Sequence, residues 1–370
     1  MAGEDVRTAF ASRLIAWQRA CGRHDLPWQE SRDPYRIWVS EIMLQQTQVA
    51  AVIPYYLRFV ARFPDVAVLA NAHEDEVLSH WSGLGYYARA RNLKRAAQAI
   101  MEEHGGVFPR TAERLAELPG IGRSTAAAIA VFAYGERGAI LDGNVKRVLA
   151  RWLGLRGWPG EASVQATLWQ KAERLLPADD IEAYTQGLMD LGSLLCTRAR
   201  PRCAACPINV DCVARRDGLT DRIPATRPAK LLPQREVALL VLLHSGEVML
   251  EKRPPTGIWG GLWSFPEMPV EADPGLESGQ RFGAGIERIG PLAPIEHGFT
   301  HFRLTLRPWL AHVNALTPQV NAPGSAWLRP RDAAAGAVPA PIRRLLLTLD
   351  REVATTAAAT DSVAHPSTPS

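Results

Sequence analysis

The sequence LPGIGRST occupies residues 118–125 and lies between two stretches whose apolar residues recur at helical spacing. Gly120 and Gly122 allow a tight turn that leaves backbone N–H groups free at the start of the second helix. Such amides, together with the partial positive charge of a helix N-terminus, bind phosphate without reading base sequence. We therefore interpret this stretch as a hairpin that holds a DNA backbone, with an ordinary turn between helices as the alternative.

Four of the five cysteines follow this hairpin and lie close together in the sequence. They are Cys196, Cys203, Cys206 and Cys212, whereas Cys21 stands apart and is expected to remain a free thiol. A disulfide framework does not fit a chain whose remainder is poor in cysteine. Four thiolates in one short loop suit either an iron–sulfur cluster or tetrahedral zinc, and ligand chemistry alone leaves that choice open.

The positive charge of the chain is unevenly distributed. The net charge is +4, and residues 1–230 contain 30 Lys and Arg against 25 Asp and Glu, whereas residues 231–370 contain 12 against 13. Arg198, Arg200 and Arg202 lie between the first two clustered cysteines, where they would present cations to phosphates or simply be solvated. We therefore expect the nucleic-acid-binding face in the N-terminal part.

Two carboxylates lie in surroundings that should push their pKa values apart, which is how an acid and a base are recognised. Glu41 borders the apolar stripe of a predicted helix, so desolvation should raise its pKa and favour the neutral form that donates a proton. Asp142 precedes another helical run, whose amides and dipole should keep its carboxylate ionised beside a developing positive charge. A surface glutamate and a plain N-cap are the alternatives.

The hairpin and the cysteine spacing C-x6-C-x2-C-x5-C together resemble the helix–hairpin–helix DNA glycosylases that include endonuclease III. The spacing matches the [4Fe–4S] arrangement of that family, so the resemblance implies one [4Fe–4S] cluster rather than zinc. Residues 26–29, the segment around Glu41, residues 83–92 and residues 141–147 extend the similarity to the MutY family of adenine DNA glycosylases over residues 5–350. The implied fold is an all-α glycosylase domain, made of a six-helix barrel and a cluster lobe, followed by an α+β Nudix-like domain.

The resemblance also implies roles for individual residues. Adenine is turned out of bent duplex DNA, Glu41 protonates its N7, and Asp142 stabilises the oxocarbenium ion, with Asn144 holding both carboxylates. The implied DNA and base contacts are Trp28 in the adenine pocket, Gln45 and Gln46 near the lesion, Tyr86 as a wedge in the base stack, the hairpin residues Gly120, Gly122 and Ser124, and the three loop arginines.

Ser124 stands where the glycosylases that also cut the strand have a lysine, so no Schiff-base amine is available there. We therefore expect a monofunctional enzyme that leaves an abasic site. Lys146 would be a source of adventitious lyase activity only.

A change in composition marks the domain boundary. We expect the catalytic domain at residues 1–216, with the cluster loop at 196–212, and a linker with three prolines at 217–236. Short β-prone runs follow, and residues 302–313 form a predicted strand that is interrupted at Pro308. The Nudix-like domain at 237–351 precedes an Ala/Thr/Ser/Pro-rich tail at 352–370, which we expect to be disordered.

In the family that the chain resembles, the C-terminal domain recognises 8-oxoguanine. The segment Phe299-Thr300-His301 matches the Phe-Ser-His segment that probes the damaged base, with threonine in place of serine. Residues 277–288 cannot replace the acidic metal-binding helix of Nudix enzymes, which argues against the alternative of a nucleotide-pool pyrophosphohydrolase. A DNA-bound iron–sulfur electron carrier is a second alternative, and it would need neither Glu41 nor Asp142.

These observations predict an adenine DNA glycosylase that hydrolyses the N-glycosidic bond of adenine mispaired with 8-oxoguanine or guanine. The expected partners are duplex DNA with such mispairs and other repair or replication proteins, and we expect a monomer. Charged residues begin at Glu4 and no long apolar run occurs, so we expect neither a signal peptide nor a membrane span. The expected location is the cytoplasm, in association with the nucleoid.

Overall fold

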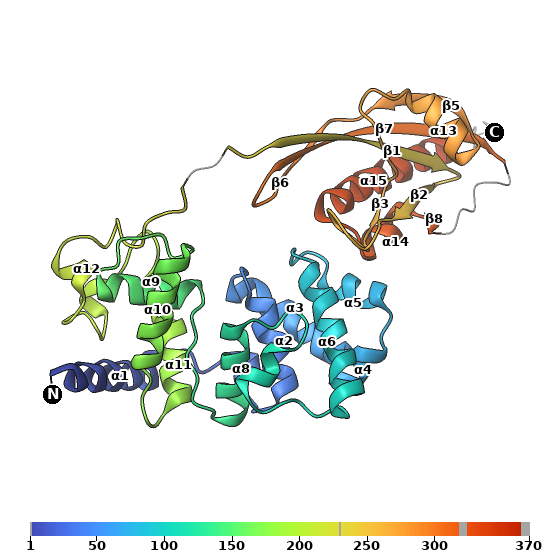
Figure 1. Cartoon of the computed structure of the whole chain (residues 1–370). Helices are drawn as coiled ribbons and strands as arrows, with labels where there is room; N and C mark the ends of the chain where they lie inside the picture. Colours follow the sequence, from blue (N-terminus) through green and yellow to red (C-terminus); the bar gives the residue numbers. More distant parts are fainter. Residues whose placement is uncertain (1, 229–230, 318–323, 364–370) are drawn as a thin grey trace, which may run out of the picture. The chain divides into compact units, whose positions relative to one another are not determined.

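The computed structural model describes residues 2–228, 231–317 and 324–363, and it divides into two compact units. The first unit comprises Met1–Asn71 and Asn92–Ala229, and the second comprises Ala72–Arg91 and Lys230–Ser370. Within the described residues the first unit is all-α, and the second combines helices with a sheet (Figure 1). The predicted fold class, an all-α domain followed by an α+β domain, is thus confirmed.

Helices of the first unit are α1 (Ala2–Cys21), α2 (Pro34–Leu44), α3 (Val49–Arg62), α4 (Val66–Asn71), α6 (Ala88–His104), α7 (Ala112–Ala116), α8 (Arg123–Tyr134), α9 (Gly143–Leu153), α10 (Ala162–Arg174), α11 (Ile181–Asp190) and α12 (Val213–Arg216). Short turns of other helix types are η1 (Pro27–Gln29), η2 (Leu191–Leu195) and η3 (Cys203–Ala205). The boundary between the two units falls inside α6, after Arg91.

Local chemistry explains where the functional helices begin. The Asp33 carboxylate accepts the Tyr35 N–H at 3.0 Å, and Pro34 occupies the first position of α2, where a missing N–H costs nothing. Helix α8 is rich in buried alanine, and such small side chains let it pack closely between α2 and α11. Helices α8 and α9 share one core, and α2 packs on α8.

A buried ion pair joins the segment after α1 to α11. The Asp190 side chain is fully buried, and its carboxylate accepts hydrogen bonds from Arg23 Nε at 2.7 Å, from the Arg23 backbone N–H at 2.9 Å and from Gln186 Nε2 at 2.9 Å. A buried carboxylate needs such partners, because an unpaired charge in the interior is costly.

The second unit contains α5 (Glu74–Trp81), β1 (Gln234–His244), β2 (Glu247–Lys252), β3 (Trp263–Ser264), β4 (Glu267–Met268), α13 (Pro274–Phe282), β5 (Ala284–Pro291), β6 (Ile295–Gly298), β7 (Arg303–Leu316), β8 (Ser325–Leu328), α14 (Pro330–Ala335) and α15 (Ala340–Val363). The main strand order is β3-β2-β1-β7-β5. Strands β1 and β7 run parallel, from the pair of Gln234 with Arg303 to the pair of Leu243 with His312.

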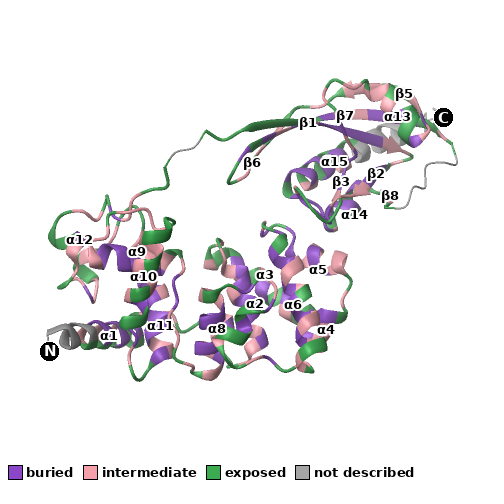
Figure 2. Cartoon of the chain, in the orientation of Figure 1, coloured by how far each residue is buried: buried purple, intermediate pink, exposed green. Residues whose placement is uncertain are grey.

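Both faces of this sheet are covered. Ala238, Leu240 and Leu242 of β1 share a core with Phe282 of α13, while the alternate residues Leu239 and Val241 are buried on the other face. The middle of β1 is accordingly buried, whereas its first residues are exposed (Figure 2). Because side chains are buried on both faces, the sheet gives firm support to the turns at its edges.

The structure differs from the sequence-based expectations in two places. Strand β7 continues through Pro308, whose carbonyl accepts the Leu292 N–H at 2.8 Å, so the predicted interruption was wrong. Helix α15 continues to Val363, into the expected disordered tail, because the alanine there favours helix; residues 364–370 lie outside the described residues. Residues 72–91, which we expect within the catalytic domain, group by their contacts with the second unit, and their domain assignment stays a prediction.

Residues between α12 and β1 contain neither helix nor strand within their described part, and the linker limits of 217–236 stay a prediction. Among the described helices, none combines the length and the apolar character needed to cross a membrane.

We predict that Asp190→Asn destabilises the first unit by about 3 kcal/mol, because it leaves the Arg23 guanidinium without its charged partner. Urea unfolding followed by far-UV circular dichroism measures the effect. Asp217→Asn is the matched control: its partner Arg216 is exposed and adjacent in sequence, so no measurable loss is expected. Equal midpoints for the two variants would contradict the structural role of Asp190.

Candidate active site

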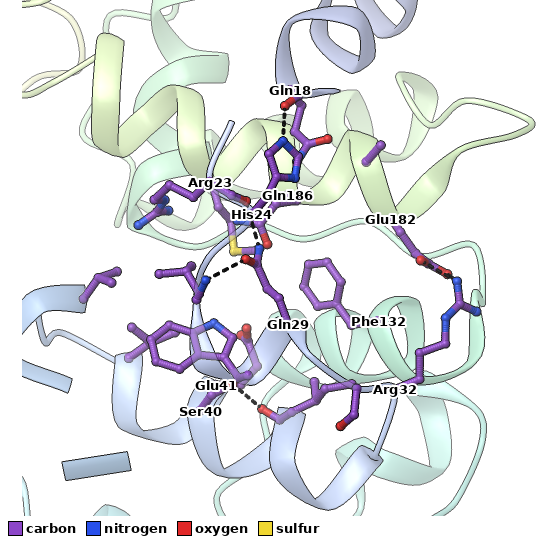
Figure 3. A pocket seen from close by; sticks show the side chains of 18 residues that line it. Gln18, Arg23, His24, Gln29, Arg32, Ser40, Glu41, Phe132, Glu182 and Gln186 are labelled. Carbon is purple, nitrogen blue, oxygen red and sulfur yellow. Dashed lines mark hydrogen bonds and ion pairs between the residues drawn. The ribbon is translucent and has the colours of Figure 1, made fainter. Parts of the chain in front are cut away.

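A pocket in the first unit is lined by two of the side chains that the sequence singled out, Glu41 and Trp28 (Figure 3). Its volume of about 360 Å³ lies in the range of small-molecule sites. Glu41 comes from α2, and Trp28 comes from η1, where its buried ring stands edge-on to Tyr56 with centroids 5.4 Å apart. A carboxyl group and a flat aromatic wall therefore line the same cavity.

Polar side chains of the pocket are already fixed by hydrogen bonds. Gln186 is bound to Asp190, His24 Nε2 lies 3.0 Å from the Gln18 carbonyl oxygen, and the Gln29 side chain donates to the Arg23 carbonyl at 3.1 Å (Figure 3). A site whose side chains are held in this way loses little side-chain freedom when a ligand binds.

Burial, and secondarily the nearby Asp142 carboxylate, raise the pKa of Glu41 to about 8. Glu41 is therefore largely protonated at neutral pH and is suited to donate a proton to a group in the pocket. The sequence predicts the same direction of shift.

Asp142 is the N-cap of α9, and its Oδ1 accepts the Val145 N–H at 2.7 Å. Burial raises its pKa, while the N–H groups of Val145 and Asn144 and the charges of Arg147 and Lys146 lower it. The net direction of the shift is upward, because burial outweighs these groups, and the ionisation of Asp142 at neutral pH stays a prediction. Hydrogen-bond donors and cations favour the ionised form of Asp142, whereas burial and the Asp142 charge both favour the neutral form of Glu41. If the two carboxyls share one proton, it therefore resides on Glu41.

The Asn144 side chain contacts Arg147, whose guanidinium donates to its Oδ1 at 2.8 Å. A Cβ on Gly192 would lie 2.6 Å from the Asn144 Cβ, so the backbone of η2 passes directly beside it. The role of Asn144 in holding Glu41 and Asp142 stays a prediction.

The hairpin has the tight geometry that its glycines predict. Gly120 has φ +78°, and a Cβ there would lie 2.6 Å from the Asn92 Cβ, so no side chain fits without movement. Gly122 is the N-cap of α8, and nothing lies within 4 Å of its missing Cβ. The amide end of α8 is thus accessible to an anion.

Ser124 ties this hairpin helix to the Asp142 segment. Its Oγ accepts the Leu141 N–H at 2.9 Å, one residue before Asp142. A serine in this position therefore fixes the backbone that leads into α9.

Gln45 and Gln46 end α2 in an unusual backbone conformation. Gln45 is the C-cap and its Nε2 lies 3.4 Å from Thr125 Oγ1, while Gln46 is exposed with φ 58°. A left-handed non-glycine residue costs free energy and is typical of functional segments.

A second pocket in the first unit is lined by all four clustered cysteines. Burial raises the pKa of the Cys206 thiol to about 12 and raises that of Cys212, so a cationic group is needed to keep these sulfurs as thiolates. In the described part of the chain, no three His, Cys, Asp or Glu side chains are grouped closely enough to hold a single metal ion. Cys21 is exposed and free.

Helix α9 also supports the cysteine loop. The buried Arg151 guanidinium lies 3.4 Å from Cys196 Sγ and donates to the carbonyl oxygens of Thr197 and Arg198 at 2.6 and 3.0 Å. Arg147 donates to the Cys196 carbonyl at 2.8 Å. The loop is therefore held by α9.

Arg198, Arg200 and Arg202 are exposed on this loop. The Arg202 guanidinium also donates to the Leu194 carbonyl at 2.8 Å, which anchors one end of the row. The arrangement is a fixed basic loop suited to phosphate contact.

In the second unit, Phe299, Thr300, His301 and Phe302 form the turn between β6 and β7. The Phe299 N–H bonds the Phe302 carbonyl at 2.9 Å, and their rings stack with centroids 4.4 Å apart. Thr300 and His301 are exposed at the tip, with Oγ1 and Nδ1 3.4 Å apart. A rigid aromatic base thus presents two polar side chains to solvent.

Tyr86 also belongs to the second unit. It is 45% exposed and has φ 51°, which is rare for a bulky residue. The Arg89 guanidinium lies over its ring at 5.6 Å and over the Trp81 ring at 5.4 Å. An exposed aromatic ring is therefore held in one orientation.

The structure brings Glu41, Asp142 and Trp28 together and collects the four cysteines around a separate pocket. Sequence reasoning missed the pocket residues of α1 and α11, Gln18 and Gln186, and the supporting Arg151. No local spacing marks them, because they lie far from Glu41 or Cys196 along the chain. A buried polar residue on an otherwise apolar helix face, as Gln186 and Arg151 are, is the signal that could have found them.

Similar proteins point the same way. Residues 39–174 match the HhH-GPD superfamily of base excision DNA repair proteins, and residues 237–348 match the NUDIX domain. A solved thermostable thymine-DNA glycosylase is 28% identical with a TM-score of 0.53, and the match covers 59% of this chain and 100% of that one.

Two adenine DNA glycosylases match most of the chain. The protein of Buchnera aphidicola subsp. Baizongia pistaciae is 34% identical over 338 residues, which are 91% of this chain and 95% of that protein. The human protein is 32% identical over 401 aligned residues, which cover 91% of this chain and 73% of that protein. Since these relatives are more than 30% identical and the similarity spans both domains, the chain belongs to the adenine DNA glycosylase family of base excision repair.

Proposed function

We propose that the protein hydrolyses the N-glycosidic bond of adenine mispaired with 8-oxoguanine or guanine in duplex DNA and leaves an abasic site. The observation that carries the proposal is the pair of neighbouring carboxyls: Glu41 in the pocket favours its neutral form, while Asp142 has amide and cationic partners. One acid and one anion side by side are what cleavage of a glycosidic bond to a poor leaving group requires.

In this mechanism adenine leaves the base stack and enters the pocket, because base chemistry cannot be done inside the duplex. Glu41 donates its proton to adenine N7, which lets the base depart with the electron pair of the glycosidic bond. The Asp142 carboxylate stabilises the oxocarbenium ion, and water adds to the sugar carbon and gives up a proton. Trp28 provides the flat apolar wall for the base, and Asn144 holds the two carboxyls.

Several exposed segments would bind the duplex. The open amide end of α8, with Gly120, Gly122 and Ser124, is suited to one phosphate, and Arg198, Arg200 and Arg202 are suited to others. Gln45 and Gln46 would contact bases near the lesion, and Tyr86 would wedge into the stack. Strained backbone at Gln46 and Tyr86 supports these roles.

The chemistry would end at base removal. Ser124 has no amine, and its Oγ is engaged by the Leu141 N–H, so it offers no nucleophile for a Schiff base. A monofunctional glycosylase follows, with Lys146 as a source of weak lyase activity only.

A [4Fe–4S] cluster is the cofactor we propose for Cys196, Cys203, Cys206 and Cys212. Four soft thiols around one pocket fit such a group, and the basic Arg151 beside Cys196 Sγ would offset part of its negative charge. When bound, the cluster supplies a structural tie among the four ligands. The same ties fix the basic loop that lies between the first two of them.

A defined-duplex assay tests the function. Adenine is placed opposite 8-oxoguanine, guanine, thymine or cytosine, and strand breaks are measured with and without hot alkali. We expect alkali-dependent breaks opposite 8-oxoguanine and guanine. Release opposite all four bases, or breaks that need no alkali, would overturn the specificity or the monofunctional mechanism, respectively.

We predict that the single-turnover rate of adenine release falls above about pH 8, where Glu41 loses its proton, and falls again in acid, where Asp142 becomes protonated. Glu41→Gln should abolish release at every pH while duplex binding persists, and Asp142→Asn should do the same. Glu161→Gln, at the exposed start of α10, is the control and should keep the wild-type profile. Release by Glu41→Gln at the wild-type rate would remove Glu41 from the reaction.

Cys203→Ser should reduce the bound iron and weaken duplex binding, because one ligand of the cluster and one anchor of the basic loop are lost. Arg151 still holds the front of the loop, so we expect reduced rather than abolished affinity. Elemental analysis and fluorescence anisotropy measure the two effects, with Cys21→Ser as the control that leaves both unchanged. Zinc without iron in the wild-type protein would refute the cluster.

The double variant Thr300→Ala/His301→Ala should lose rate on adenine opposite 8-oxoguanine and retain it opposite guanine. Both side chains are exposed at the tip of a rigid turn, and one or two hydrogen bonds at roughly 1 kcal/mol each correspond to about a tenfold selective loss. Single-turnover rates on the two duplexes measure it. Equal losses on both duplexes, or no loss on either, would exclude this turn from lesion recognition.

A further inference from the structure

The segment that carries Tyr86 is fastened to the Nudix-like sheet and helices, although it lies within the glycosylase part of the sequence. Residues 72–91 and 230–370 form one compact unit. At the start of α5, Lys252 Nζ lies 2.7 Å from the Asp75 carboxylate. At the other end of the segment, the Arg91 guanidinium donates to the Gly260 carbonyl. Two contacts thus hold the segment at both ends.

A third contact lies between these two and is the most buried. Arg343 of α15 donates from one guanidinium nitrogen to Ser82 Oγ at 2.7 Å and to the Gly336 carbonyl at 3.1 Å, and its Nε donates to the Ala334 carbonyl at 2.8 Å. Ser82, itself buried, donates its hydroxyl proton to the Val338 carbonyl at 2.9 Å. One guanidinium therefore joins α14, α15 and the turn that follows α5.

The contact of Arg343 with Ser82 lies near Tyr86 in the sequence, and hydrogen bonds hold the turn between Ser82 and Tyr86. Ser82 precedes the turn of Gly83, Leu84 and Gly85, and the Trp81 indole N–H donates to the Gly85 carbonyl at 3.2 Å. The buried Arg89 donates to that same carbonyl at 3.2 Å and lies over the Tyr86 ring. The turn between Ser82 and Tyr86 is thus bonded to Trp81 on one side and to Arg89 on the other.

We propose that Arg343 is a positioning residue for Tyr86, through which the Nudix-like part of the chain holds the side chain that wedges into the DNA. The inference rests on the wedge role given to Tyr86 above. The turn of Phe299–Phe302, proposed to contact 8-oxoguanine, and Tyr86 then belong to one compact unit. Contact of the turn with an oxidised base and insertion of Tyr86 would therefore depend on the same unit.

The test uses the full-length protein and a duplex with 2-aminopurine beside 8-oxoguanine, whose fluorescence rises when the stack is opened. Arg343→Met should lower both this signal and the single-turnover rate on the order of tenfold, as for the loss of a hydrogen bond to a charged group. Arg343→Lys should restore part of both, since an ammonium still reaches Ser82 Oγ. Arg329→Met, which removes an exposed arginine of the same unit paired with Asp332, is the control and should match the wild type.

Ser82→Ala is the second variant, because it leaves Arg343 bonded to the Ala334 and Gly336 carbonyls and so spares the packing of α15. It removes the hydrogen bond to the Ser82 hydroxyl and keeps the longer one to the Ser82 carbonyl, so a smaller loss in the same direction is expected. Tyr86→Ala should lower the signal at least as far, and adding Arg343→Met to Tyr86→Ala should cause no further loss, since Arg343 acts through Tyr86.

Additive losses in the double variant would show that Arg343 acts as general support for the fold and would overturn the proposal. So would a wild-type signal from Arg343→Met and Ser82→Ala while Tyr86→Ala is impaired. If Tyr86→Ala itself keeps the wild-type signal, the wedge role fails and the positioning role fails with it, which separates the two cases.

Discussion

The hydrogen bond from the Val145 N–H to the Asp142 carboxylate, 2.7 Å long, starts α9 and fixes where that carboxylate lies. Helices α10, α11 and α12 and the turn η2 pack against this helix. Ser124 holds the residue before the cap, Arg147 and Arg151 hold the cysteine loop two turns later, and Gly154 ends the helix in the left-handed conformation. One helix thus connects the hairpin, the proposed catalytic anion and the cluster loop.

In the proposed mechanism, two opposite influences act on the protonation of Asp142, the N-cap of α9. Burial beside Glu41 raises the pKa of Asp142, whereas stabilisation of a cation requires that it be ionised. The amides of α9 and the charges of Lys146 and Arg147 oppose the burial, and Glu41 has no comparable group among the influences on its pKa. The pair therefore works as one titrating system in which the proton prefers Glu41. Each carboxyl then depends on the other for its role.

The sequence predicts the parts of this arrangement that depend on local spacing. The hairpin glycines, the N-cap at Asp142, the four cysteines and the change from helices to strands are all visible in short windows. The direction of the Glu41 shift also follows from its place on an apolar stripe. What the sequence does not reveal are long-range effects, such as the burial that outweighs the helix start at Asp142, the Asp190 network behind the pocket and the Arg151 contacts to the cysteine loop.

Residues 72–91 show the same limit at the level of domains. Their helical pattern and their place in the chain assign them to the glycosylase domain, yet they bond to Lys252, Gly260 and Arg343 of the C-terminal part. Domain boundaries that are inferred from composition are continuous along the chain. Packing instead depends on which surfaces fit together, and for residues 72–91 the two criteria give different domains. That segment carries Tyr86, an exposed tyrosine with left-handed backbone, which costs free energy and persists only when its surroundings enforce it. We attribute this enforcement to the unit on which the segment packs.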